Sequence, residues 1–140
     1  MTTIKKRILA IDYGTKRIGL AKSDPLCLFA QPVGTFSESE LYKQIQLILD
    51  QDGIEKILVG YPTSGDGSAN RMTSVVNAFI ERLHQHFPTL PIERIAEFGS
   101  SKKAMQILIA SGVSRKERHI KGRLDKAAAA ILLQTYLEQR

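Results

Sequence analysis

The chain contains one cysteine and no tryptophan in 140 residues, and aromatic residues make up only 6% of it. A single cysteine, Cys27, excludes an internal disulfide and a metal site built from cysteines. This cysteine usage is compatible with a reducing compartment, and we expect a cytoplasmic protein. The apolar runs are too short for a signal-peptide core or a membrane span, so we expect no membrane partner.

The sequence also lacks internal repeats, low-complexity segments and linkers. Hydrophobic residues make up 43% of the chain and charged residues 24%, which is ordinary for a globular protein. A chain of 140 residues is long enough to bury a substantial core. We therefore expect one domain that spans residues 1–140.

The most informative stretch is residues 7–21, in which two apolar runs flank a tight turn. The first run, residues 8–11, is typical of a strand that is buried on both faces. The turn that follows is short enough to fold the two runs into a hairpin. Asp12 then lies at the tip of a core strand, where burying a charge is costly unless a metal or a donor compensates it. The alternative is an Asp that caps the turn through its own backbone.

The rest of the chain alternates between helix and strand. A proline at position 32 indicates that the third strand is bent or lies at a sheet edge. Together with the hairpin, this order predicts a mixed sheet with helices on its faces. The expected later elements are a strand over 28–36, a helix from 37 to 51, a strand over 56–62, a helix from 72 that ends before Phe87, a strand over 91–99, a helix after Ser101 and a final helix over 123–138.

Three acidic residues stand in apolar surroundings: Asp12, Glu97 at the end of the last expected strand, and Asp125 in the final helix. The residues three, four and seven positions after Asp125 are apolar, which places it on the helix face that packs against the sheet. The alanine run 127–130 lets that helix approach closely. Each acid alone could instead belong to a turn, a strand end or a first helical turn. Together they can converge at the carboxyl edge of a parallel sheet, where α/β folds commonly bind ligands.

Carboxylates that crowd in one pocket repel one another, so such a site needs divalent cations. Oxygen ligands favour Mg²⁺ or Mn²⁺. Two such ions about 4 Å apart can activate a water and stabilise the leaving oxygen in phosphodiester cleavage. Asp12, Glu97 and Asp125 are therefore the predicted catalytic residues and metal ligands.

The net charge of +6 is unevenly distributed, because residues 102–126 hold eight Lys or Arg and only two acids. Phosphate backbones are the natural partner of such a basic patch, although a solvated basic loop is the plain alternative. Nucleic acid is the predicted partner. The predicted contacts are Lys16, Arg17, Lys102, Lys103, Arg115, Lys121, Arg123 and Lys126.

Four motifs resemble signatures of the YqgF/RuvX family, in order and over nearly the whole chain: residues 11–19 (IDYGTKRIG), 23–25 (SDP), 59–62 (VGYP) with 66–68 (DGS), and 125–129 (DKAAA). The first motif is quite specific. The resemblance implies an α/β fold similar to ribonuclease H and to Holliday junction resolvases, with a mixed five-stranded sheet flanked by helices. It also implies a cytoplasmic nuclease that matures the 5′ end of pre-16S rRNA, with Asp12, Glu97 and Asp125 at its three metal-ligand positions.

One departure from the family pattern lies at the last strand. Family members usually carry an Asp-Glu-Arg-Leu-Thr-Ser-like run where residues 96–101 read AEFGSS. Glu97 is kept, but Ala96 stands in place of the Asp and Phe98 in place of the Arg. If that Asp assists metal binding or that Arg holds phosphate, this protein is slower or altered in substrate.

Three functional hypotheses follow. The first is a two-metal-ion endonuclease, a hydrolase of phosphodiester bonds that acts on structured RNA in ribosome biogenesis. The second is a Holliday junction resolvase acting on branched DNA, which would favour a symmetric dimer; the sequence leaves monomer and homodimer open. The third is a non-catalytic nucleic-acid-binding factor with a degenerate active site. Metal-dependent cleavage separates the first two from the third.

Overall fold

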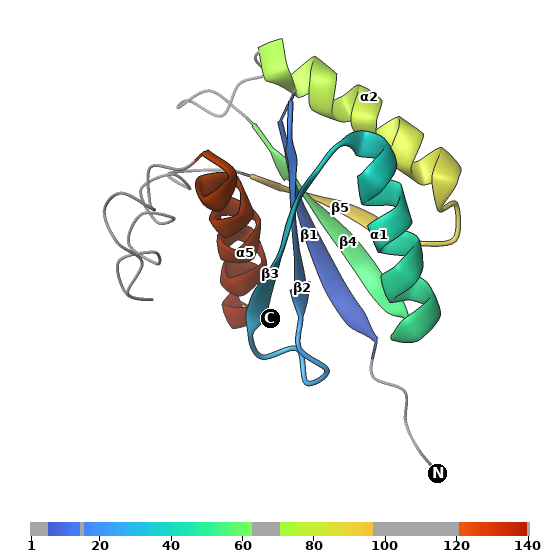
Figure 1. The fold of residues 1–140 in the computed structure, drawn as a ribbon, viewed down its shortest axis with the longest axis vertical. Coiled ribbons are helices and arrows are strands. Elements are labelled where there is room, and N and C mark those ends of the chain that lie inside the picture. Colours follow the sequence, from blue (N-terminus) through green and yellow to red (C-terminus); the bar gives the residue numbers. More distant parts are fainter. Residues whose placement is uncertain (1–5, 15, 63–70, 97–120, 140) are drawn as a thin grey trace.

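The computed structural model describes residues 6–14, 16–62, 71–96 and 121–139, with no side-chain description for residues 96 and 121–127. In this part of the chain, five strands form one sheet in the order β3-β2-β1-β4-β5 (Figure 1). Helices α1 and α2 lie on one face of the sheet and α5 lies on the other. The elements are β1 (Arg7–Tyr13), β2 (Ile18–Ser23), β3 (Ala30–Phe36), α1 (Glu38–Gln51), β4 (Ile54–Tyr61), α2 (Arg71–His86), β5 (Ile92–Ala96) and α5 (Lys121–Gln139).

The sheet is mixed, as the sequence predicts. Strands β1, β2 and β3 form an antiparallel meander, whereas β4 is parallel to β1 and β5 is parallel to β4. In the parallel part of the sheet, Ile11 of β1 is opposite Val59 of β4, and Val59 is opposite Arg94 of β5. The carboxyl ends of β1, β4 and β5 therefore meet at the same edge of the sheet.

Strand β1 is buried on both faces, which confirms the interpretation of its apolar run. Leu9 and Ile11 belong to the core under α1 and α2, whereas Ile8 and Ala10 belong to the core under α5. All four side chains are fully buried. This division follows from the alternation of side chains along a strand.

Helix α1 begins and ends at the residues that its sequence indicates. The Ser37 side chain accepts a hydrogen bond from the Glu40 backbone amide and caps the helix, and Asp52 terminates it. Gly53, with φ of 80°, then takes the left-handed conformation that favours glycine. Three apolar residues at helical spacing, Leu41, Ile45 and Ile48, face the core.

Helix α5 packs small residues against small residues. Ala129 is fully buried in the same cluster as Ala10 of β1 and Ala21 of β2. The alanine run therefore has the packing role expected of it. Among the helices of the described segments, none has the length and apolar character needed to cross a membrane.

The third strand begins at Ala30, so the predicted start at residue 28 is wrong. The Asp24 carboxylate accepts hydrogen bonds from the backbone amides of Leu28, at 2.7 Å, and Phe29, at 2.8 Å. These bonds hold residues 24–29 as a closed loop instead of a strand, and they lower the pKa of Asp24. Leu28 and Phe29 are exposed there. Residues 97–99 and the helix expected after Ser101 lie outside the described segments.

Strand β3 lies at an edge of the sheet, as its proline predicts. Pro32 is opposite Ala21, and Gly34 is opposite Leu20. Val33 therefore has no partner in β2, and the register shifts at this point. This extra residue is a β-bulge on the edge strand.

Candidate active site

Asp12 lies at the carboxyl end of β1, opposite Gly19 of β2. Its side chain is on the same face of the strand as Ile8 and Ala10, and this face is covered by α5. Asp12 is half-buried. The structure thus places this carboxylate at the strand end and on the sheet face where a site shared with α5 requires it.

The turn after Asp12 is tightly closed. The Gly14 amide donates to the Arg17 carbonyl oxygen at 3.0 Å. A Cβ atom at position 14 would lie only 2.5 Å from that same oxygen, so this close approach requires glycine. Lys16 and Arg17 are exposed within the turn. The turn therefore presents two cations close in the chain to the Asp12 carboxylate.

Gln134 anchors α5 to the start of β3. Its side-chain oxygen accepts a hydrogen bond from the Ala30 amide at 2.9 Å. Ala30 is opposite Ser23 of β2, and the Ser23 hydroxyl accepts from the Ile8 amide at 2.9 Å. Gln134 therefore lies level with Ile8, at the end of β1 that is farther from Asp12.

This anchor places the backbone of Asp125. Asp125 precedes Gln134 by nine residues, which is about 13 Å along a helix. Asp12 follows Ile8 by four residues, which is also about 13 Å along a strand. Figure 1 shows the start of α5 and the carboxyl end of β1 at the same end of the molecule. The backbone of Asp125 therefore lies toward the end of the sheet that carries Asp12.

The structure describes only part of the predicted residue set. Glu97 follows Ala96, which is opposite Tyr61 at the end of β4, but Glu97 itself lies outside the described residues. Among the described side chains, which include only Asp12 of the three predicted ligands, no group of three His, Cys, Asp or Glu is placed to hold a metal ion. The three-carboxylate site therefore stays a prediction.

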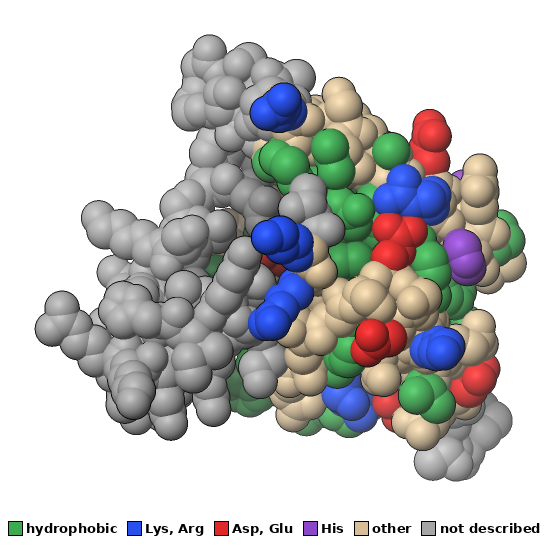
Figure 2. All heavy atoms as spheres, turned by 45° about the horizontal axis from the view of Figure 1, so that its top comes forward, with side chains coloured by type: hydrophobic (Ala, Val, Ile, Leu, Met, Phe, Trp, Pro, Cys, Tyr) green, Lys and Arg blue, Asp and Glu red, His purple; other side chains and the backbone are tan. Residues whose placement is uncertain are grey.

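Only some of the predicted nucleic-acid contacts have described side chains. Lys16 and Arg17 are described and exposed, and Figure 2 shows Lys and Arg side chains on the face that comes forward from the top of Figure 1. The remaining predicted contacts are Lys102, Lys103 and Arg115, which lie outside the described residues, and Lys121, Arg123 and Lys126, which lie in α5 without a described side chain.

One cation close to the end of β5 was missed by reasoning from the sequence. The Arg94 guanidinium lies 5.8 Å from the centre of the Tyr61 ring and donates to the Asn77 side-chain oxygen at 3.2 Å. Asn77 in turn donates to the Tyr61 hydroxyl at 3.1 Å. The period-two alternation of β5 could have placed Arg94 on the α2 face, but nothing in the sequence indicates its partners.

A second polar cluster lies at the end of β1, on the sheet face that α1 and α2 cover. Arg82 of α2 donates to both carboxylate oxygens of Glu38, at 2.8 and 2.9 Å, and to the Tyr13 hydroxyl at 3.4 Å. The Tyr42 hydroxyl also donates to Glu38, at 2.6 Å. The Arg82 hydrogen bonds lower the pKa of Glu38, while burial and the Glu38 carboxylate raise the pKa of Tyr42. Sequence reasoning missed this cluster as well.

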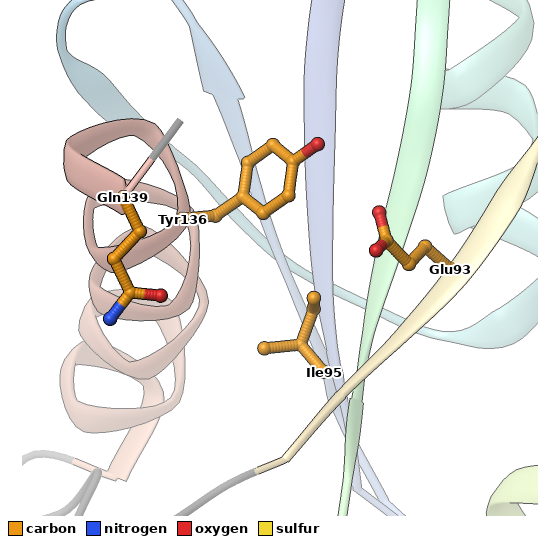
Figure 3. Close-up of a pocket in the computed structure, with 4 residues that line it drawn as sticks. All are labelled: Glu93, Ile95, Tyr136 and Gln139. Carbon is orange, nitrogen blue, oxygen red and sulfur yellow. The ribbon is translucent and has the colours of Figure 1, made fainter.

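A cavity of about 480 Å³ opens between β5 and α5, and none of its described lining residues belongs to the Asp12 turn. Figure 3 shows Glu93 and Ile95 of β5 opposite Tyr136 and Gln139 of α5. Lys56 donates to the Tyr136 hydroxyl at 2.8 Å and lies 3.5 Å from Glu93, and the bond to Tyr136 raises the pKa of Lys56. The carboxylate in the described lining of the cavity is therefore paired with a lysine.

Comparison with known proteins identifies the family. The RuvX family model, described as Holliday junction resolvase, matches residues 6–139. Two relatives, each named "Putative pre-16S rRNA nuclease", come from Prosthecochloris aestuarii and Chlorobium phaeobacteroides. They are 62% and 58% identical to this chain, over 96% and 95% of its length and 95% and 92% of theirs.

Among solved structures, RuvC of T. thermophilus in complex with a Holliday junction substrate superposes with a TM-score of 0.55, over 96% of both chains. At 14% identity, this likeness concerns the fold alone. It confirms the ribonuclease H-like α/β fold, with a mixed five-stranded sheet flanked by helices. The motif order, the family match and the two relatives agree, and this chain belongs to the RuvX family.

Proposed function

We propose that this protein is a metal-dependent endonuclease that processes the 5′ end of pre-16S rRNA in the cytoplasm during ribosome biogenesis. Its proposed catalytic residues and metal ligands are Asp12, Glu97 and Asp125. The observation that supports the proposal is the position of Asp12, at the end of β1, on the sheet face that α5 covers and toward the end at which α5 begins. The names of the relatives supply the substrate class.

The donor chemistry of this set fits Mg²⁺ or Mn²⁺, because all three side chains offer carboxylate oxygens. Asp12 is half-buried, which limits competition from water without closing the site. Two bound ions would supply an activated water and stabilise the leaving oxygen. The role of Asp12 is to hold its oxygens at a fixed strand end, which a central strand buried on both faces supports better than a loop.

Lys16 and Arg17 are suited to hold the phosphates on either side of the scissile bond. Both are exposed in the closed turn that begins two residues after Asp12. The net charge of +6 attracts RNA at longer range, and the release of counterions makes such binding salt-sensitive.

The test compares the wild-type protein with an Asp12→Asn variant on a pre-16S 5′-leader RNA and on a four-way DNA junction, each with and without Mn²⁺. Asp50→Asn is the matched control, because Asp50 is an exposed carboxylate on α1, on the other side of the sheet. We expect Mn²⁺-dependent cleavage of the RNA that is lost in Asp12→Asn and kept in Asp50→Asn. Binding to both substrates without cleavage of either would contradict the proposal and indicate a non-catalytic binding factor.

The second candidate function is resolution of branched DNA, which the description of the matching family model favours. The same three carboxylates would serve it. Cleavage of the four-way junction in preference to the leader RNA would select this function. A resolvase that cuts two strands acts best as a symmetric dimer, so sedimentation analysis of the same sample separates monomer from homodimer.

A further inference from the structure

The residue that follows Asp12 points to the opposite face of the sheet. Tyr13 packs with Leu9 and Ile11 in the α1 and α2 core, whereas Asp12 shares its face with Ile8 and Ala10. The two side chains are attached to adjacent Cα atoms of one strand. A contact that immobilises Tyr13 therefore also immobilises the backbone that carries Asp12.

Tyr13 is held at two points by α2. Its ring stacks on the fully buried Phe79, with ring centres 4.5 Å apart and planes inclined by 27°. Its hydroxyl accepts a hydrogen bond from Arg82 at 3.4 Å. Phe79 and Arg82 are three residues apart, so both reach Tyr13 from the same face of α2.

Arg82 is itself fixed by Glu38 at the start of α1. The two hydrogen bonds from Arg82 to the carboxylate form a bidentate pair, whose planar geometry restricts the rotation of the guanidinium. The same guanidinium nitrogen that contacts one Glu38 oxygen contacts Tyr13. The cluster thus joins the first residue of α1 and the last turns of α2 to the end of β1.

We propose that Arg82, oriented by Glu38, is a positioning residue that acts through the Tyr13 hydroxyl to fix the end of β1 and the Asp12 turn. This inference rests on the proposed nuclease function. Arg82 and Glu38, which together form a brace on Tyr13, belong to α2 and α1 and lie on the face of the sheet opposite α5. Loss of the brace would leave the donor set intact and displace it by a fraction of an ångström, which affects the rate more than the binding of RNA.

Tyr13→Phe tests this role with little disturbance, because it removes the hydroxyl and keeps the stacked ring and the Arg82–Glu38 pair. The matched control is Tyr136→Phe, which removes a phenol that accepts from Lys56 on the other side of the sheet. Each protein is measured for kcat and KM on the leader RNA with Mn²⁺, and for hydrogen exchange of the Gly14 amide, which donates to Arg17.

We expect Tyr13→Phe to lower kcat roughly three- to tenfold with KM within about twofold, and to speed Gly14 exchange by a similar factor. Arg82→Gln should do the same, and the double variant should be no slower than Arg82→Gln alone, since both act through one contact. Tyr136→Phe should change neither readout.

A Tyr13→Phe protein with wild-type kcat overturns the inference, whatever its exchange rate. If the wild-type protein itself cleaves neither substrate, the proposed function fails. The hydrogen exchange of the Gly14 amide then tests by itself whether Arg82 and Glu38 fix the end of β1. Faster Gly14 exchange in Tyr13→Phe and Arg82→Gln, with no change in Tyr136→Phe, supports the inference. Unchanged exchange overturns it.

Discussion

Replacing Gly14 by alanine tests the geometry of the turn that follows Asp12. The new Cβ would lie 2.5 Å from the Arg17 carbonyl oxygen, and contacts of Cβ atoms below 3.0 Å essentially never occur. The neighbour is backbone, which cannot rotate away as the end of a flexible side chain can. The turn must therefore open by roughly 0.5 Å or more, which is about the tolerance of a catalytic arrangement.

Opening the turn stretches the hydrogen bond from the Gly14 amide to the Arg17 oxygen, now 3.0 Å long. A lost backbone hydrogen bond costs about 1 kcal/mol, and residual strain adds a similar amount. The expected destabilisation is therefore about 2 kcal/mol. With a urea m-value of about 2 kcal/mol/M, the unfolding midpoint should fall by about 1 M.

Urea unfolding followed by circular dichroism measures this shift, with Lys16→Ala as the control for stability. Lys16 is exposed in the same turn, and its truncation should change stability by no more than about 0.5 kcal/mol. Cleavage of leader RNA by Gly14→Ala should fall about 10- to 100-fold, because the end of β1 moves with the turn. A Gly14→Ala protein with the unfolding midpoint of the wild type would contradict this prediction, since the turn would then have room for a side chain.

Two further predictions concern the helices. Ala129→Leu places a larger side chain where α5 meets Ala10 and Ala21. We expect the free energy of unfolding, measured by urea unfolding, to fall by about 1–3 kcal/mol. An unchanged unfolding midpoint would mean that α5 can move outward. Arg82 holds the pKa of Glu38 below its usual 4.5, so the stability that this carboxylate contributes is present above pH 4.5 and is lost as the pH falls through its lowered pKa. We expect Glu38→Gln to lower the Tm by about 3 °C at pH 7, and this difference from the wild type should shrink as the pH falls below 4.5, whereas a Tm difference independent of pH would contradict the linkage.

Much of the fold follows from local patterns in the sequence. The apolar run of β1, the capping Ser37 and the spacing of Leu41 and Ile45 depend on neighbours within a few residues, and periodicity reveals them. The predicted start of β3 is wrong because the Asp24 carboxylate accepts hydrogen bonds from backbone amides that strand pairing would otherwise use. A side chain can compete with a neighbouring strand for the same backbone amides, and hydrophobic periodicity does not reveal this competition.

The candidate site was predictable where it depends on a strand. The apolar run and the tight turn predict Asp12 at the tip of a core strand, and Asp12 lies there, but the helix that covers its face is known only from the structure. The brace on Tyr13 was not predictable, because Glu38 and Arg82 are 44 residues apart and meet only after two helices have packed. Lys56 and Tyr136, 80 residues apart, are a second example. Such pairs are set by packing angles that no short pattern encodes.

The bulge and the proline of β3 bear on how copies of this protein can associate. An exposed edge strand normally offers a ladder of amides and carbonyls on which another chain can polymerise. Pro32 removes one amide from that ladder, and the unpaired Val33 bends it out of register. Among the described strands, β3 is therefore a poor edge for pairing with a second copy, and we expect a homodimer to form through another surface. Concentrated protein is likewise protected from strand-by-strand aggregation along this edge.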